Sequence, residues 1–227
     1  MTDSSAAAPE TARRTLLERV AAEIRETGDA TGCYALSERV RQALLAVPRH
    51  HFVPEERQGW AYANTPLPID CGQTISQPFI VALMTELLIP DPAATILEIG
   101  TGSGYQAAVL ARLVRQVYSI ERIPELAQAA IQRLHTLHIN NVTIRVGNGA
   151  QGWAEHAPFD GVMVTAAATE VPATLVAQLK PGGRLVIPVG EPGQTQDLRV
   201  IVKDEQGTVS SHSILPVVFV PLIAERA

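Results

Sequence analysis

Apolar residues recur at helical spacing near the start of the chain, which predicts helices there. From 11 to 27 they follow i, i+3, i+4 spacing, and Gly28 ends the pattern. A second helix is expected from Ser37, a favourable N-cap, to the stop signal at Pro48. Residues 1–10 are small, polar and Ala-rich, so we expect a disordered tail before the first helix.

The stretch from 48 to 76 is rich in Pro and Gly and shows no lasting period. Such long irregular segments within a compact protein are usually functional loops or linkers. Residues 77–88 regain helical spacing, with Pro78 in the first turn, where a missing N–H is tolerated. We therefore expect N-terminal helices and an active-site loop segment over residues 11–91.

Short apolar runs alternate with Ala-rich helical segments from residue 92 onward. This alternation predicts an α/β fold with a doubly wound, Rossmann-like sheet, mostly parallel and covered by helices on both faces. The last apolar runs read as antiparallel strands at the sheet edge. Residues 92–227 then form the α/β core, in one compact domain with the N-terminal part. The expected strands are 95–99, 117–121, 142–146, 161–165, 184–188, 198–202, 208–214 and 217–220, and the expected helices are 104–115, 124–138 and 171–180.

The composition fits this fold and narrows the classes of function. Hydrophobic residues make up 46% and aromatic residues only 4%, which favours buried parallel strands under Ala-rich helices. A net charge of −5 argues against a nucleic-acid-binding protein. Two cysteines and no Cys/His cluster offer neither a disulfide framework nor a zinc site. With no secretory signal and no apolar stretch near the roughly 20 residues that span a bilayer, a cytoplasmic protein without membrane contact is expected.

A glycine-rich loop follows the first expected strand of the core. Gly100, Gly102 and Gly104 lie where the strand gives way to a helix, and glycines let a backbone turn sharply and approach a ligand. The dinucleotide fingerprint G-x-G-x-x-G/A would need a small residue where this chain has Tyr105. With Glu98 in the preceding strand, the spacing E-x-G-x-G-x-G is similar instead to the S-adenosylmethionine loop of class I methyltransferases.

Two positions after the next strands also suit a nucleotide-like cofactor. Glu121 ends the second strand, where an acid can accept hydrogen bonds from both ribose hydroxyls. Dinucleotide-binding proteins share an acid at this position. Asn148 and Gly149 follow the third strand, and the Asn148 carbonyl can accept from an adenine amino group. A simple Asn-Gly turn explains Asn148 equally well, and a solvated strand end remains an alternative for Glu121.

A series of sequence blocks resembles the protein-L-isoaspartate O-methyltransferase family. The most specific is GQTISQP, which ordinary class I methyltransferases have no reason to contain. The similarity runs from the second helix to residue 222. The blocks are VPRHHFVP, AYANTPLPI, GQTISQP and VALMTELL before LEIGTGSGYQ, then SIER, QGW, FDGVMVTAA, LKPGGRLVIPVG and FVPL.

The resemblance implies methyl transfer from S-adenosylmethionine to the carboxylate of L-isoaspartyl residues in damaged proteins, which starts repair through a succinimide. It implies a catalytic Ser76, with S-adenosylhomocysteine as the product and no metal. Two departures are an Asn148 where the family usually has an acid, and an Asp70-Cys71 pair where a Gly is common. The implied cofactor-binding residues are Gln73, Thr74, Ile75, Ser76, Glu98, Gly100, Gly102, Gly104, Glu121, Asn148 and Gly149.

The chemistry of this reaction suits the residues without reference to the family. A carboxylate with an ordinary pKa near 4 is already ionised at neutral pH, so its methylation requires no general base. A serine hydroxyl can hydrogen-bond that carboxylate and orient it toward the methyl group. Taken alone, Ser76 reads more simply as the N-cap of the helix that follows, a role compatible with catalysis.

Three alternatives stay open at this point. The first is a class I methyltransferase acting on a different small-molecule or protein carboxylate, and the second is a cofactor-binding regulator without catalysis. The third is a nicotinamide dehydrogenase, which Tyr105 disfavours. The expected partners are isoaspartyl-containing proteins and peptides, with neither nucleic acid nor membrane, and the expected state is a monomer.

Overall fold

The structure is a computed structural model that describes the backbone of residues 4–223 and the side chains from residue 9 onward. Its centre is a seven-stranded sheet. The strands are β3 (Thr95–Ile99), β4 (Gln116–Glu121), β5 (Val142–Val146), β6 (Phe159–Val164), β7 (Leu179–Val189), β8 (Gln196–Lys203) and β9 (Val209–Val217). Their spatial order is β5-β4-β3-β6-β7-β8-β9. β3 to β7 pair in parallel, whereas β8 and β9 run antiparallel to their neighbours, so the predicted sheet is confirmed.

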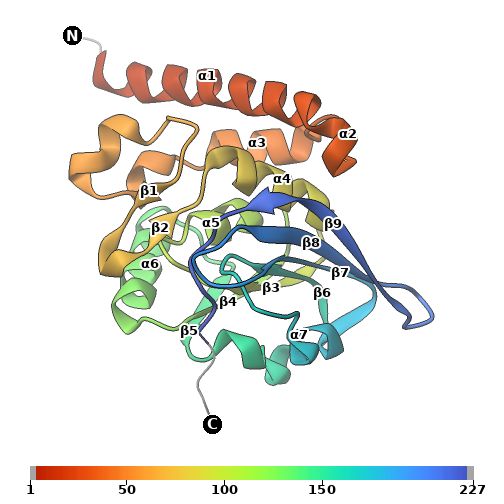
Figure 1. Ribbon diagram of the computed structural model, residues 1–227. Coiled ribbons are helices and arrows are strands. Elements are labelled where there is room, and N and C mark those ends of the chain that lie inside the picture. The colour runs from red at the N-terminus through yellow and green to blue at the C-terminus, as the bar shows by residue number, and fades with distance from the viewer. Residues whose placement is uncertain (1–3, 224–227) are drawn as a thin grey trace.

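Helices cover both faces of this sheet, and a further helical layer lies over one of them (Figure 1). One apolar core lies between the sheet and the N-terminal helices, and a second lies on the opposite face around α7 and Trp153. In Figure 1, α1 crosses the top of the molecule above α3 and α4. The helices are α1 (Ser4–Glu26), α2 (Gly28–Thr31), α3 (Glu38–Ala46), α4 (Pro78–Leu88), α5 (Tyr105–Ala111), α6 (Pro124–Thr136) and α7 (Ala173–Ala177).

Most element types agree with the sequence predictions, and the differences lie at element ends. Ser37 does cap α3, since its side chain accepts from the Val40 N–H. α1 begins at Ser4, inside the stretch 1–10 that was expected to be a disordered tail, and residues 1–3 lie outside the described residues. α5 and α7 are shorter than predicted because the chain turns early to enter β4 and β7.

The strand predicted over 217–220 is wrong. β9 ends at Val217, and the following segment, residues 218–223, leaves the sheet edge. It is fastened by two backbone hydrogen bonds, from the Ala167 N–H to the Val220 carbonyl and from the Leu222 N–H to the Ala167 carbonyl. The apolar side chains of this segment therefore lie beside the end of β6 rather than in a further strand.

The irregular stretch 48–76 is ordered by short elements and by one buried cation. It contains the 3-10 turns η1 (Arg49–Phe52), η2 (Glu55–Trp60) and η3 (Asp70–Gly72), and a ribbon of β1 (Leu67–Pro68) with β2 (Thr74–Ile75). Arg49 is 1% exposed, its Nε donates to the Ala61 carbonyl, and its Cζ lies 5.0 Å from the centre of the Tyr105 ring. This contact holds the stretch against the first turn of α5.

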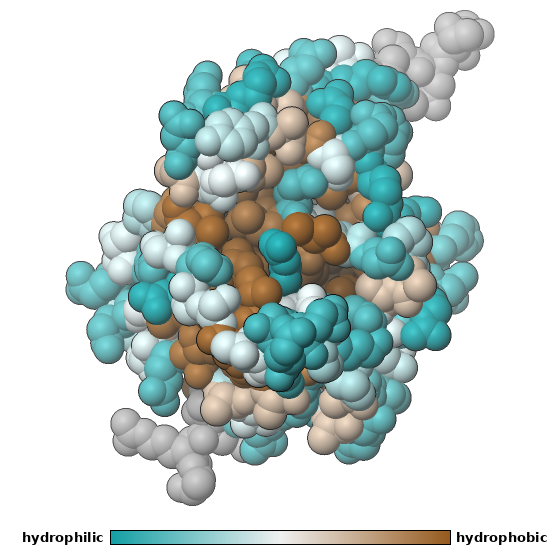
Figure 2. Space-filling view, turned by 90° about the vertical axis from the view of Figure 1, so that its right-hand side faces the viewer, coloured by the Kyte–Doolittle hydropathy of each residue, from teal (hydrophilic) through white to brown (hydrophobic). Residues whose placement is uncertain are grey.

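The face on which β9 lies has a hollow at its middle, lined by apolar side chains and surrounded by polar ones (Figure 2). In the same orientation the N-terminal helices form the upper part of the molecule and the C-terminal sheet the lower part. α2 contacts β9 here, and α4 contacts β7. The hollow thus marks the border between the helical layer and the antiparallel half of the sheet.

The strand order places a ligand crevice at β3. From β3 the chain proceeds outward through β4 to β5, and it then returns to β6 on the other side of β3. In open α/β sheets, ligands bind outside the carboxyl ends of the strands at such a switch point. Ile99, Glu121 and Val164 end β3, β4 and β6, so the crevice is expected beside these residues.

Candidate active site

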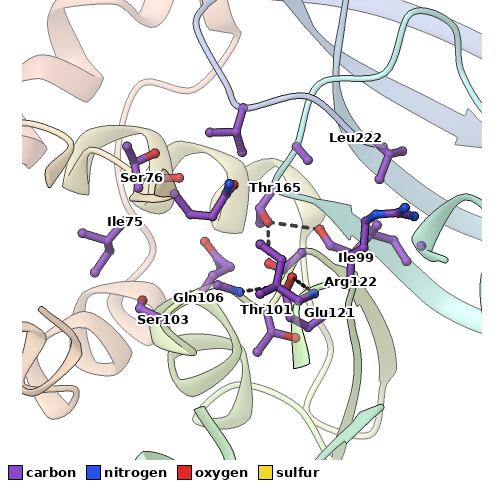
Figure 3. A pocket seen from close by; sticks show the side chains of 18 of the residues that line it. Ile75, Ser76, Ile99, Thr101, Ser103, Gln106, Glu121, Arg122, Thr165 and Leu222 are labelled. Carbon is purple, nitrogen blue, oxygen red and sulfur yellow. Dashed lines mark hydrogen bonds between the residues drawn. The ribbon is translucent and has the colours of Figure 1, made fainter. Parts of the chain in front are cut away.

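A cavity opens at this switch point, and segments from several distant parts of the chain form its walls (Figure 3). One wall is the β2 segment Gln73–Ser76, and another is the glycine loop with the start of α5. Strand ends contribute Ile99, Glu121 and Thr165, and residues 220–223 close the remaining side. The predicted residues that line it are Gln73, Thr74, Ile75, Ser76, Gly100, Gly102, Glu121 and Gly149.

The glycine loop takes a conformation that other residues rarely adopt. Gly100 and Gly104 have φ angles of +91° and +87°. A Cβ on Gly100 would lie 2.5 Å from the Thr165 hydroxyl oxygen, and one on Gly104 would lie 3.2 Å from the Ala130 Cβ of α6. Gly100 therefore permits the close approach of β6 at the cavity. Gly104, which does not line the cavity, permits close packing of α5 on α6.

Glu121 is fixed in place by two backbone donors. Its Oε2 accepts from the Gly102 N–H at 2.8 Å, and its Oε1 accepts from the Ile123 N–H at 2.9 Å. The side chain is 6% exposed and borders the cavity. Each carboxylate oxygen can accept a further hydrogen bond, so the two oxygens can bind two neighbouring hydroxyl groups such as those of a ribose.

Exchanging Glu121 for Gln tests this assignment. The amide would turn an NH2 group toward one of the two backbone N–H donors and would lose the charge that strengthens hydrogen bonds to hydroxyls. We expect affinity for S-adenosylhomocysteine to fall about tenfold, measured by isothermal titration calorimetry. The exposed Glu125→Gln change on α6 is the matched control. Equal affinities for wild type and Glu121→Gln would remove Glu121 from the binding site.

Glu98 lies beneath the glycine loop and not in the cavity wall. It is fully buried, and its Oε2 accepts from the Ser119 hydroxyl at 2.5 Å, while its Oε1 has no partner among the described residues. The Ser119 oxygen lies 2.5 Å from that of Thr101, which does line the cavity. Burial raises the pKa of Glu98 to about 8, with the Ser119 hydrogen bond opposing the shift and Glu121 adding to it.

Asn148 also lies outside the cavity wall, although its neighbour Gly149 borders the cavity. The Asn148 carbonyl oxygen accepts from the Ala150 N–H at 3.0 Å and caps the short turn η4 (Gly149–Gln151). The oxygen that was predicted to accept from adenine thus has a backbone donor already. Asp70, the other departure from the family pattern, is exposed on η3 and borders no part of the cavity.

Ser76 is not the N-cap of α4, so that prediction is wrong. The cap position is Gln77, which makes no side-chain cap hydrogen bond. Asn64 replaces it, since its Oδ1 accepts from the Phe79 N–H at 3.0 Å and its amide donates to Glu23 of α1 at 2.5 Å. Within the described part of the chain the Ser76 hydroxyl has no hydrogen-bond partner, which leaves it available to a ligand.

Several residues of the cavity have no assigned role in the sequence analysis. Thr165 joins the end of β6 to the glycine loop, because its hydroxyl lies 2.6 Å from the Gly100 carbonyl. Gln106, in the first turn of α5, was read only as part of a helix. Pro221 and Leu222 belong to the family block FVPL, and the resemblance of that block to the family could have indicated that they lie at the site.

The lining suits S-adenosylmethionine. Glu121 can take the ribose, Ile123 and Leu222 add apolar surface to the lining, and Ser76 lies on the side opposite Leu222 (Figure 3). Among residues 4–223, no three His, Cys, Asp or Glu side chains are grouped so that they could hold a metal ion. The sheet, the glycine loop and the acid at the end of β4 together define a class I S-adenosylmethionine-dependent methyltransferase.

Comparison with known proteins specifies the family. The profile of the family described as protein-L-isoaspartate(D-aspartate) O-methyltransferase (PCMT) matches residues 24–227. The chain belongs to this family. It is 54% identical over 211 residues to protein-L-isoaspartate O-methyltransferase 2 of Syntrophobacter fumaroxidans, covering 93% of the chain and 85% of that relative. The protein of the same name from Polaromonas sp. is also 54% identical, over 93% of the chain and 100% of the relative.

Solved structures agree with the family assignment. One described as a protein-L-isoaspartate O-methyltransferase has a TM-score of 0.79 and 28% identity over 92% of the chain, which spans 65% of that longer protein. Another, from Plasmodium falciparum, was solved in complex with S-adenosyl-L-homocysteine. It has a TM-score of 0.76 and 27% identity, covering 93% of this chain and 98% of that one.

Proposed function

We propose that the chain transfers the methyl group of S-adenosylmethionine to the carboxylate of L-isoaspartyl residues in damaged proteins and peptides. The observation that carries this proposal is the position of Ser76 and Thr74. Both residues border the cofactor cavity, and both also border a second cavity. A group at this junction can contact a cofactor and a separate substrate at the same time.

The second cavity has the lining expected for an extended peptide segment. Apolar side chains predominate, with a few polar groups that can orient a backbone. Val218 at its edge is 77% exposed, so the site opens to the solvent from which a protein substrate would enter. The lining residues are Pro66, Thr74, Ser76, Gln77, Ile80, Thr195, Pro216, Val217, Val218 and Phe219.

Ser76 is proposed as the catalytic residue that orients the acceptor. Its free hydroxyl can donate to one oxygen of the isoaspartyl carboxylate and leave the other oxygen to attack. The bound cofactor supplies an electrophilic methyl group on a sulfonium, and the carboxylate needs no deprotonation at neutral pH. Orientation of this kind can contribute roughly 7–11 kcal/mol to lowering a barrier.

The cofactor contacts are proposed from the same geometry. The methionine half of the cofactor would be surrounded by Gln73, Thr74 and Ile75. The cofactor would also lie close to the backbones of Gly100, Gly102 and Gly149. Glu121 would hold the ribose. Glu98 and Gly104 would act indirectly, through the Ser119–Thr101 hydrogen bonds and through helix packing. Asn148 would contact the cofactor by its amide NH2 group or by the second lone pair of its carbonyl oxygen, which already accepts from the Ala150 N–H.

The alternative function most similar to this proposal is that of a class I methyltransferase acting on a different carboxylate. An enzyme for small carboxylic acids has no need of the open second cavity beside Ser76. The two proposals separate in a methyl-transfer assay that offers an isoaspartyl peptide, the matching aspartyl peptide and free carboxylic acids. Selective methylation of the isoaspartyl peptide supports our proposal, and preference for a free acid supports the rival.

The cellular role would be the first step of repair. Methylation turns the carboxylate into an ester with a better leaving group, so the backbone nitrogen of the substrate can attack it. Methanol leaves, and the resulting succinimide hydrolyses partly to normal aspartate. The substrates would be many ageing proteins, and we propose that the enzyme acts in the cytoplasm as a monomer, without nucleic acid or membrane. None of the helices in residues 4–223 is both long enough and apolar enough to cross a bilayer.

A further inference from the structure

Gln106 is a buried amide in the wall of the cofactor cavity. The residue follows Tyr105 in the first turn of α5 and is 8% exposed. Its Nε2 donates to the Thr85 hydroxyl oxygen at 3.0 Å, across the interface between α5 and α4. A buried amide needs partners for both its donor and its acceptor, so the position of its oxygen decides what it can bind.

Thr85 fixes which end of the amide faces the cavity. The Thr85 side chain is fully buried, and its hydroxyl donates its single proton to the Val81 carbonyl at 2.7 Å. That hydroxyl can therefore only accept from Gln106, which assigns the NH2 group of Gln106 to Thr85. The carbonyl oxygen of Gln106 is left without a hydrogen-bond partner among the described residues. This oxygen is not fully buried, and Gln106 lines the cavity, so the oxygen is accessible to a ligand there.

The location of Gln106 matches the reacting end of the cofactor. Figure 3 shows it on the same side of the cavity as Ser76, Ile75 and Ser103, opposite Arg122 and Leu222. Thr85 and Val81 lie on α4, the helix that begins directly after the Ser76-Gln77 pair. An acceptor at this end would meet the methionine half of the ligand, whereas Glu121 serves the ribose.

We propose that the Gln106 carbonyl oxygen accepts a hydrogen bond from the α-ammonium group of the cofactor's methionine half, and that Thr85 is the positioning residue that sets the amide. The inference rests on the proposed function, since it requires S-adenosylmethionine in the cavity. The α-ammonium is the one strong donor on that half of the ligand. Glu121 is the single carboxylate among the described lining residues, and it is assigned to the ribose and held by two backbone N–H groups. The α-ammonium group is therefore expected to bind a neutral acceptor.

Calorimetry with two ligands tests this assignment. S-Adenosylhomocysteine carries the α-ammonium group, and 5′-methylthioadenosine shares its adenosine and thioether but lacks the amino-acid part. Gln106→Met keeps the size and flexibility of the side chain and removes the acceptor. We expect it to weaken S-adenosylhomocysteine binding about tenfold and to leave methylthioadenosine binding unchanged. Gln132→Met, an exposed change on α6, is the matched control and should alter neither.

A second variant guards against misfolding of the first. Gln106→Asn retains an amide but shortens it, so it cannot reach both Thr85 and the ligand, and the same selective loss is expected. Equal affinity of wild type and both variants for S-adenosylhomocysteine would overturn the inference while the proposed function stands. An equal loss of affinity for both ligands would show that Gln106 only supports the packing of the site, and this result would overturn the inference as well. A wild-type protein that binds neither ligand would overturn the proposed function and this inference together.

Discussion

Replacing Ser76 by alanine is expected to lower the turnover of an isoaspartyl peptide about 100-fold, the loss typical of removing one transition-state hydrogen-bond donor. The Ser76 hydroxyl makes no hydrogen bond within the described chain and caps no helix, so its removal leaves no donor or acceptor of the fold unpaired. Affinity for S-adenosylhomocysteine should stay unchanged, because the hydroxyl acts on the acceptor carboxylate while the rest of residue 76 still borders the cofactor cavity.

The measurement is single-turnover methyl transfer with saturating cofactor, together with calorimetry for S-adenosylhomocysteine. Ser211→Ala, on the exposed part of β9, is the control for a serine hydroxyl outside the site. Unchanged turnover in Ser76→Ala would remove this residue from the mechanism. A variant that lost cofactor affinity and turnover in equal proportion would show that Ser76 binds the cofactor instead.

Replacing Glu98 by glutamine is expected to stabilise the protein, and to do so more strongly as the pH rises. The folded-state pKa of Glu98 is about 8, against an ordinary value of 4.5, because burial penalises the charged form. Between these values the folded protein holds a proton that the unfolded chain has released. The free energy of unfolding of wild type therefore falls as pH rises from 4.5 to 8, and this loss is complete above the folded pKa.

Glutamine has no such titration, so Glu98→Gln should match wild type near pH 4.5 and exceed it by about 3 kcal/mol at pH 7. Urea unfolding at a series of pH values measures the difference between the two proteins. Glu170→Gln, which removes an exposed carboxylate, controls for net charge. A constant difference across pH would contradict the assignment of a protonated Glu98. Lower stability of Glu98→Gln at high pH would mean that the buried carboxylate has a cationic partner.

The sheet was predictable from the sequence because its strands are short apolar runs between helical segments. β3, β5 and the glycine loop were placed by period and by turn residues, which are local signals. Glu121 followed from the same logic, since strand order alone puts the end of β4 beside the loop. Helix ends were less accurate, since α5 stops at Ala111 where the chain must enter β4, and local spacing cannot report that requirement.

The parts of the site that escaped prediction depend on contacts between distant residues. The N-cap role of Asn64 toward α4 joins residues 15 positions apart, so Ser76 was the better local candidate. The orientation of Gln106 is set by Thr85 on another helix. The Asn148 carbonyl oxygen accepts from a backbone N–H two residues ahead, a contact that its own turn provides and that the spacing of the motif does not predict. Sequence spacing identifies such residues only after the packing is known.

The most direct test of the account is transfer of labelled methyl from S-adenosylmethionine to a short isoaspartyl peptide, with the normal aspartyl peptide as its twin. The two peptides have the same composition and charge and differ only in which carboxyl forms the backbone bond. The account predicts that wild type labels the isoaspartyl peptide selectively and that Ser76→Ala does so about 100-fold more slowly. Equal labelling of both peptides, or none while S-adenosylhomocysteine still binds, would contradict the proposed substrate and leave only the class I methyltransferase fold.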